Sequence, residues 1–410
     1  MGSGAQAAQE AHEGNVRTRR TDDPDIRQGK PGRRPEPEPP RADAADAWRH
    51  AKSVFPEFLV WLKVFRDPRK RPDLATFPLD YLVLLALMMF SSQCRSRRRL
   101  GKALTGGRLA ANVWRLAGKA FSEACHTDTM NNIMIGLEPE ELEQLIVKMV
   151  GRLRTRKMLR RFLLGGKFVV AIDGTQLFRV NEPVGEGWLT QTKDGKTTYS
   201  RYVLAAKIVT AAGLVVPFAF EFVENPASGE FDKQDCELKA CRRLMDKIHC
   251  LYPRLQIAVV GDALFAEETT LCRCEELGWD FFMTLQNDKL PTVNRQLPQP
   301  GEAWSGERKV CAAVKDHREK GVHHVRWQTP VSYHGEVYHV LHFTEYAPDG
   351  SQLYHNVWLT NVKPDAENAI ELALHGRLRW KIDYADIPNM QSDGRPLYLQ
   401  HPIRETAVAA

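Results

Sequence analysis

The strongest constraint on the fold is a short apolar run, FVVAI at 168–172, that ends in Asp173. A continuous run of branched and aromatic residues of this length predicts a strand buried on both faces. A second run, LQIAVVG at 255–261, ends in Asp262 and the small Ala263. Ligands of open α/β sheets gather at the carboxyl ends of strands, so these two carboxylates are candidates to share a divalent cation.

A strand that ends in Asp also has a purely structural interpretation. An aspartate in that position often caps a helix or closes an Asx-turn. The repetition of the pattern at Asp173 and Asp262 keeps the ligand interpretation open beside the structural one. Two divalent ions about 4 Å apart would activate a nucleophile and stabilise a leaving oxygen at phosphorus.

The spacing of apolar residues changes several times along the 410-residue chain. Its length exceeds what one hydrophobic core usually serves, and 43% hydrophobic residues suffice for the cores of two or three modules. Helical spacing comes first, and short strands alternating with helices follow, which is typical of an α/β fold. The predicted segments are a disordered tail at 1–46, a helical domain at 47–166, a first core part at 167–290, a β-rich insertion at 291–348, a closing core part at 349–383 and an aperiodic tail at 384–410.

Within the first core part, the pattern predicts individual elements. Strands at 199–211 and 213–225 form a hairpin that turns at Ala212 and Gly213. A helix is expected over 235–252 and a further strand over 280–286.

Cysteine usage and hydropathy restrict the compartment. The eight cysteines show neither a disulfide framework nor zinc-ligand spacing, so we expect reduced thiols. The N-terminus has no apolar signal region, and the apolar stretch 79–90 is shorter than the roughly 20 residues that span a bilayer. A soluble, cytoplasmic protein with no membrane partner is expected.

Positive charge is clustered, although the formal net charge is only +6. Basic stretches occur at 66–71, 95–99 and 151–161. A single such stretch is usually a solvated helix face, but three in one segment favour contacts with duplex phosphates, which position a protein without reading bases. The candidates for DNA contact are Arg95, Arg97, Arg98, Arg99, Arg154, Arg156 and Lys157.

In the β-rich segment, we expect Trp327 and Tyr338 to pack within the sheet, with stacking on an extruded base as the alternative. The histidines of this segment lack ligand spacing and are expected in ordinary surface or core roles.

From about Phe55 to Ile382 the sequence resembles bacterial DDE transposases of the insertion-sequence-4-like group. The resemblance is carried, in order, by PLDYLVLLALMMF (78–90), HTDTMNNIM (126–134), FVVAIDGTQLF (168–178), KQDCELKACRRL (233–244), IAVVGDALFA (257–266), WLTNV (358–362) and GRLRWKI (376–382). It implies an α/β fold in which an RNase H-like core is interrupted by a β-rich insertion and preceded by an all-helical DNA-binding domain.

The resemblance also implies a function. Asp173 and Asp262 would be the first two catalytic carboxylates and would bind two Mg²⁺ or Mn²⁺ ions. The partners would be double-stranded DNA, at terminal inverted repeats and at a target, and a second copy of the chain in a synaptic homodimer. Arg379, in the shared segment GRLRWKI, is a further candidate for DNA contact. The expected location is the nucleoid of the bacterial cytoplasm.

The third acidic residue departs from the family pattern. The family continues Arg-Trp-x-Ile with Glu, whereas this chain has Asp383, one methylene shorter, and Pro388 soon after it. Asp383 is the third candidate for catalysis and metal binding, and a displacement of about 1 Å lowers the activity of such a site. The aperiodic tail suggests a change of reading frame near codon 383. Three hypotheses stay open: an active transposase, a remnant that only binds DNA, and an RNase H-fold nuclease.

Overall fold

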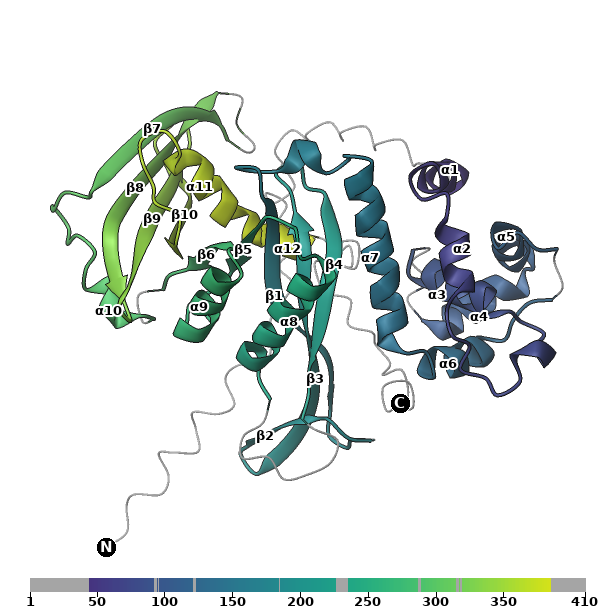
Figure 1. Cartoon of the computed structure of the whole chain (residues 1–410). Coiled ribbons are helices and arrows are strands. Elements are labelled where there is room, and N and C mark those ends of the chain that lie inside the picture. The colour runs from purple at the N-terminus through teal and green to yellow at the C-terminus, as the bar shows by residue number, and fades with distance from the viewer. Residues whose placement is uncertain are drawn as a thin grey trace, which may run out of the picture. The chain divides into compact units, whose positions relative to one another are not determined.

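The computed structural model describes residues 44–384, except 92–93, 95, 121–122, 184, 226–234, 287–288, 315–316 and 318. The predicted tails therefore lie almost wholly outside the described residues. From Lys52 onward these residues form one compact unit, and Ala44–Ala51 belongs to another. The fold is mixed α/β, with one large sheet of both parallel and antiparallel strands (Figure 1).

The elements before Phe168 are helical. The core of this region includes the apolar helix α3, in which Leu82, Val83, Leu84 and Leu85 are buried; a helix that is hydrophobic on all sides is stable only in such surroundings. Within the described ranges, none of the helices is both long and apolar enough to cross a bilayer. The elements are α1 (Ala44–Val54), α2 (Phe58–Lys63), a 3₁₀ turn (Pro72–Leu74), α3 (Leu79–Ser91), α4 (Arg97–Thr105), α5 (Arg108–Leu116), α6 (Thr127–Ile135), α7 (Pro139–Thr155) and a 3₁₀ turn (Arg160–Phe162).

The sheet has the strand order β2-β3-β1-β5-β6-β10-β9-β8-β7, with β4 also paired to β3. Strands β1, β3 and β4 are antiparallel, β5 and β6 run parallel to β1, and β10 pairs antiparallel with β6. The strands are β1 (Phe168–Val180), β2 (Leu189–Lys193), β3 (Lys196–Val209), β4 (Val215–Val223), β5 (Ile257–Gly261), β6 (Asp280–Thr284), β7 (Gly306–Ala313), β8 (Lys320–Tyr333), β9 (Glu336–Tyr346) and β10 (Gln352–Thr360).

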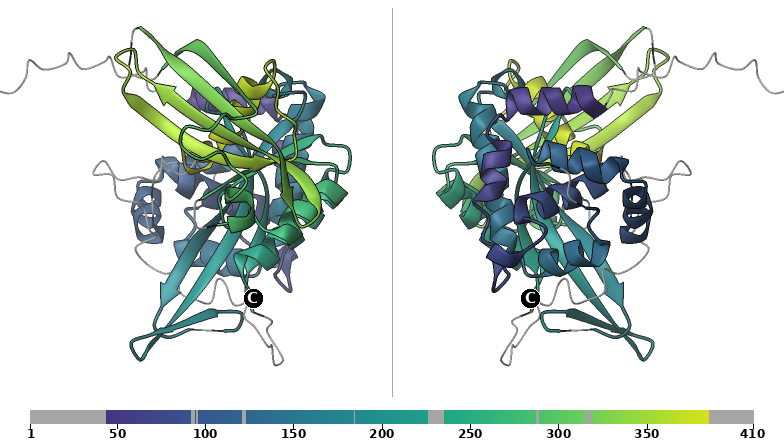
Figure 2. Two further views of the ribbon diagram at one scale, coloured as in Figure 1. Left: turned by 90° about the vertical axis from the view of Figure 1, so that its left-hand side faces the viewer. Right: turned by 90° about the vertical axis from the view of Figure 1, so that its right-hand side faces the viewer.

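Helices cover both faces of the central strands. Successive side chains of a strand point to opposite faces, so a strand that is apolar throughout must be buried on both sides. Val170 and Ile172 of β1 pack into a core shared with α8 (Glu237–Leu251) and α9 (Glu268–Glu276). Val169 and Ala171 pack into a second core with the C-terminal helices, on the opposite face (Figures 1 and 2). The remaining elements are α10 (Pro291–Asn294), α11 (Ala369–Arg377), a 3₁₀ turn (Leu378–Trp380) and α12 (Lys381–Tyr384).

The first core strand is longer than the sequence indicates. We expected it to end at Asp173, but β1 continues to Val180, and this expectation was wrong. The extra residues pair with β3, and together with β2 they form an arm that projects beyond the helices (Figure 1). Burial explains the error: the run that is apolar on both faces ends at Ile172, and the arm alternates between half-buried and exposed residues.

Candidate active site

Two aspartates lie just beyond the last pair of the ladder between the parallel strands β1 and β5. That last pair is Ala171 with Val260, and Asp173 and Asp262 each follow it by two residues. β5 ends at Gly261 and pairs with β1 as far as Ala171, so both carboxylates stand where the parallel ladder stops. The expectation from the sequence that these two strands bring both aspartates to one edge stays a prediction, which the parallel pairing of β1 and β5 supports.

Each aspartate also makes a local backbone hydrogen bond. The amide of Gly174 donates to Oδ1 of Asp173 at 2.9 Å, and the amide of Leu264 donates to Oδ1 of Asp262 at 2.9 Å. The bond to Asp262 is the Asx-turn that the structural interpretation of the motif predicted. A carboxylate has about four acceptor sites, so such a turn and a bound cation are compatible.

Arg379 lies beside the first aspartate. Its Nη1 is 3.9 Å from Oδ2 of Asp173, and its guanidinium stacks over the ring of Trp380 at 4.3 Å from the centroid. Both residues belong to the 3₁₀ turn that follows α11, and the Arg379 side chain is only 12% exposed. The residue proposed from the sequence as a DNA contact therefore carries a positive charge at the candidate site itself.

A third carboxylate, which the sequence reasoning did not identify, lies against the residue that follows Asp173. Glu237 occupies the first turn of α8. Burial, and then the charges of Asp262 and Asp173, raise the pKa of Glu237 above its ordinary value. The carboxylate lies against the backbone of Gly174, where an added Cβ would be 2.5 Å from Oε1 of Glu237. Glu237 is therefore near both aspartates although it belongs to a different element.

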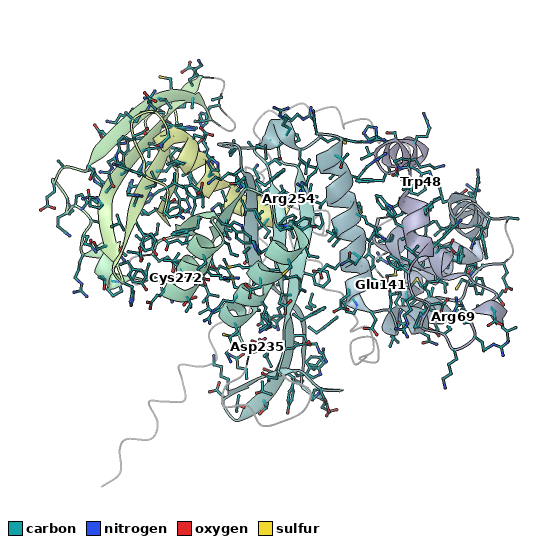
Figure 3. The ribbon with its side chains drawn as sticks, in the orientation of Figure 1. Trp48, Arg69, Glu141, Asp235, Arg254 and Cys272 are labelled. Carbon is teal, nitrogen blue, oxygen red and sulfur yellow. The ribbon has the colours of Figure 1, made fainter. Side chains whose placement is uncertain are left out.

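An ion network fixes the start of α8, where Asp235 precedes the first turn (Figure 3). Arg243 contacts Asp235 at 2.7 Å and Glu221 of β4 at 2.8 Å, and it also donates to the carbonyl of Phe222. Burial alone would raise the pKa of Asp235, but the hydrogen bonds and charge of Arg243 outweigh it and lower that pKa. The network ties the helix to β4 and so fixes the position of Glu237.

The third acid expected from the sequence, Asp383, falls in α12, and its side chain lies outside the described residues. The backbone around it is placed: Ile382 packs in the core that contains Ala171, and Lys207 of β3 donates to the carbonyl of Ile382 at 3.5 Å. The segment thus runs beside β1. Within the part of the chain that the structure describes, no three His, Cys, Asp or Glu side chains are already close enough to hold a metal ion.

The predicted DNA-contact residues of the helical region lie on two helices. Arg98 and Arg99 are exposed on α4, whereas Arg97 pairs with Asp128 at 3.3 Å. Arg95 lies outside the described residues. At the end of α7, Arg154, Arg156 and Lys157 are exposed, and Arg156 also donates to the carbonyl of Ser53 at 2.5 Å.

Other side chains singled out in the sequence have structural roles. Trp327 and Tyr338 are buried, which confirms sheet packing and contradicts their use as stacking platforms for a base. His323 lies 3.5 Å from the buried carboxylate of Glu345. All eight cysteines are free, including Cys272 on α9 (Figure 3).

Comparison with known proteins adds no relative. None of the protein-family models matches the chain, and no curated protein matches its sequence.

Proposed function

We propose that this chain is a DDE-type transposase that cleaves DNA strands at the ends of an insertion sequence and joins them to target DNA. The observation that carries the proposal is that Asp173 and Asp262 each lie two residues beyond the last pair of the parallel ladder between β1 and β5. Two carboxylates held rigidly at one sheet edge are what a metal-dependent phosphoryl-transfer site requires. The family resemblance of the sequence supports the same conclusion.

The strand topology supports an RNase H-like core in this proposal. Strands β4, β3 and β1 form an antiparallel meander, and β5 and β6 follow as strands parallel to β1. The order β4-β3-β1-β5-β6, a meander followed by two strands parallel to β1, is what supports this part of the proposal. The strands β7–β9 continue the same sheet through β10, as a β-rich insertion before the closing helices.

The residues present suit a divalent ion in their chemistry. Mg²⁺ prefers oxygen ligands, and it is usually held by one or two carboxylates together with waters and substrate phosphates. Burial, and then the negative charges of Asp262 and Asp173, raise the pKa of Glu237, and a bound cation would offset this repulsion. Two ions of Mg²⁺ or Mn²⁺, bound between Asp173 and Asp262, belong to the proposal, with Asp383 as a further candidate ligand.

Divalent ions at such a site activate the attacking oxygen and stabilise the leaving one at phosphorus. Asp173 and Asp262 would hold the ions, because their strands fix both side chains. The guanidinium of Arg379, next to Asp173, would stabilise the negative charge that develops on the phosphate. Water breaks one phosphodiester bond in the first displacement, and the released 3′-hydroxyl attacks a target phosphodiester in the second.

DNA is the proposed partner, and the exposed arginines Arg98 and Arg99 of α4 and the basic end of α7 would contact its phosphates. Synapsis of two element ends would involve a homodimer, in the bacterial cytoplasm. These assignments follow from the proposed reaction and the resemblance together.

The experiment uses the full chain with linear DNA that includes the sequence flanking its coding region, in MgCl₂ or MnCl₂. Cleaved strands and joined products are expected, and both should vanish in the Asp173→Ala variant. Cleavage without joining would favour an RNase H-fold nuclease. Salt-sensitive binding with no metal-dependent product would favour a remnant that binds DNA only.

A further inference from the structure

We propose that Glu345 of β9 is a positioning residue of the proposed site and acts on Arg379 through Arg377, the last residue of α11. This inference rests on the proposed function, because Arg379 is the residue assigned there to the reacting phosphate. Glu345 belongs to the outer strands of the sheet, so it would influence the reaction without contacting the DNA or a metal ion.

A buried ion pair joins β9 to the end of α11. Oε2 of Glu345 lies 2.5 Å from Nη2 of Arg377, and the Glu345 side chain is only 4% exposed. The guanidinium of Arg377 also lies over the rings of Phe343 and Tyr354, at 5.8 Å and 4.9 Å from their centroids. A buried carboxylate keeps its charge only beside a partner, so the pair fixes where the arginine can lie.

The backbone at the end of α11 is also tightly packed. A Cβ on Gly376 would lie 2.6 Å from Cδ2 of Trp358, so the helix backbone lies directly against this buried side chain of β10. Leu378 is buried in the core that contains Trp358 (Figure 1 shows α11 against the outer strands). Three successive residues, 376–378, are therefore held in place directly before Arg379.

Only one residue separates the ion pair from the arginine of the site. α11 ends at Arg377, and the 3₁₀ turn Leu378–Trp380 begins at the next residue. Arg379 lies within this turn, with Nη1 at 3.9 Å from Oδ2 of Asp173. Because a misplacement of about 1 Å can slow a reaction about a hundredfold, a small shift of the helix end would be enough to impair the site.

The ion pair is better suited to fixing a position than to stabilising the fold. Both charges lose hydration when they are buried, and apolar side chains of similar size often stabilise a protein as much or more. An ion pair adds direction, because a guanidinium and a carboxylate bind each other in a defined geometry. We therefore assign the pair of Glu345 and Arg377 to the placement of Arg379.

The test uses two variants of the full chain, each made in the parent and in Arg379→Gln. Arg377→Met removes the guanidinium and keeps an apolar stem over the two rings. The apolar double variant, Glu345→Leu with Arg377→Met, removes both charges of the pair. The rate of Mn²⁺-dependent nicking of supercoiled plasmid is measured at saturating DNA, and the melting temperature reports folding.

The matched control is Asp280→Asn. Asp280 begins β6 and lies 2.5 Å from Nζ of Lys167, which directly precedes β1. This half-buried ion pair also joins two elements of the sheet, but it lies at the opposite end of the parallel ladder from Asp173. Asp280→Asn should nick within about twofold of the parental rate.

In the parent, Arg377→Met and the apolar double variant should each slow nicking at least about fivefold. In Arg379→Gln, each should change the rate less than about twofold, because the residue that the pair positions is already absent. A purely structural role would slow nicking by the same factor with and without Arg379. The melting temperature of the apolar double variant should equal or exceed that of the parent.

Three results would overturn the role of Glu345. The first is a parental nicking rate in the apolar double variant, and the second is equal slowing in the parent and in Arg379→Gln. The third is loss of folding in the apolar double variant, which would show that the ion pair serves stability.

The Asp173→Ala variant separates this inference from the proposed function. If the parent nicks and Asp173→Ala does not, but the apolar double variant nicks at the parental rate, the role of Glu345 fails and the proposed function stands. If Asp173→Ala nicks at the parental rate, or if the parent does not nick, the proposed function fails and the role of Glu345 fails with it.

Discussion

The carboxylate of Glu237 lies against the backbone of Gly174, so close that a Cβ on Gly174 would come within 2.5 Å of Oε1. The contact joins the first turn of α8 to the strand that carries Asp173. A single methyl group at position 174 would therefore displace the carboxylate of Glu237.

This contact predicts that Gly174→Ala lowers Mn²⁺-dependent nicking tenfold or more while the chain stays folded. The free energy of unfolding should change by no more than about 1 kcal/mol, because alanine suits the strand and the displaced group is the end of a flexible side chain. Urea denaturation and plasmid nicking measure the two effects.

Two variants control that experiment. Gly151→Ala adds a methyl group to α7 where nothing lies within 4 Å, so nicking should be unchanged. Adding Glu237→Asp to Gly174→Ala shortens the displaced side chain and should restore part of the activity. A Gly174→Ala variant that nicks at the parental rate would contradict the importance of the contact.

Arg379→Gln should have opposite effects on metal binding and on nicking. Arg379 lies 3.9 Å from Asp173, so its removal takes away a positive charge that competes with the metal, and Mn²⁺ affinity should be retained or increased. Nicking should nevertheless fall at least tenfold, because the phosphate loses its guanidinium.

Arg254→Gln is the control for this pair of measurements. Arg254 is exposed and precedes β5, at the end of that strand opposite to Asp262 (Figure 3), so neither Mn²⁺ affinity nor nicking should change. Loss of Mn²⁺ binding in Arg379→Gln would instead indicate that the arginine organises the site.

The exposed arginines of α4 should contribute to DNA affinity and to the dependence of that affinity on salt concentration. Arg98→Gln and Arg99→Gln are each expected to weaken binding to duplexes of any sequence and to reduce the slope of log K against log salt by about 1. Arg97 is paired with Asp128, so Arg97→Gln should have a smaller effect. Fluorescence anisotropy over a range of salt concentrations measures the slopes, and equal slopes in all three variants and the parent would place the DNA elsewhere.

Histidines of the outer strands, His342 of β9 above all, should make the stability of the fold depend on pH. Burial, and then the charges of Arg326 and His355, lower the pKa of His342 from 6.5 to about 4. Between these values the unfolded chain binds a proton that the native chain does not, so the free energy of unfolding falls as the pH drops from 6.5 toward 4 and is fully retained above 6.5.

His342 alone contributes at most about 3 kcal/mol to this loss. His342→Gln should therefore unfold with a weaker pH dependence than the parent in urea titrations at pH 7 and pH 5. The dependence should not vanish, since burial also lowers the pKa of His323 and His355. The same pH dependence in the variant and the parent would show that His342 is not neutral in the native state.

The sequence predicted the elements that depend only on neighbouring residues, such as strands marked by an apolar run and a hairpin marked by its turn. The hairpin expected at 199–225 is present as β3 and β4, turned at Gly213, where a φ of 82° favours glycine. The buried strands that precede Asp173 and Asp262 were also predictable, because each is a continuous apolar run, and they are present as the parallel neighbours β1 and β5.

Glu237 could not be found by the same means. An acidic residue in the first turn of a helix is common because it interacts favourably with the helix dipole, so Glu237 had an ordinary explanation. Its relation to Asp173 arises from the packing of α8 across the sheet, which no periodicity encodes. The one available signal was the glycine after Asp173, a strand position where a second group approaches closely.

The most direct test of the central claim is the rate of Mn²⁺-dependent plasmid nicking by the parent chain, Asp173→Asn and Asp262→Asn, with folding checked by melting temperature. If the two aspartates hold the metal, each substitution should lower the rate at least about a hundredfold and leave the chain folded. Nicking at the parental rate by either variant would contradict the shared site at the ends of β1 and β5.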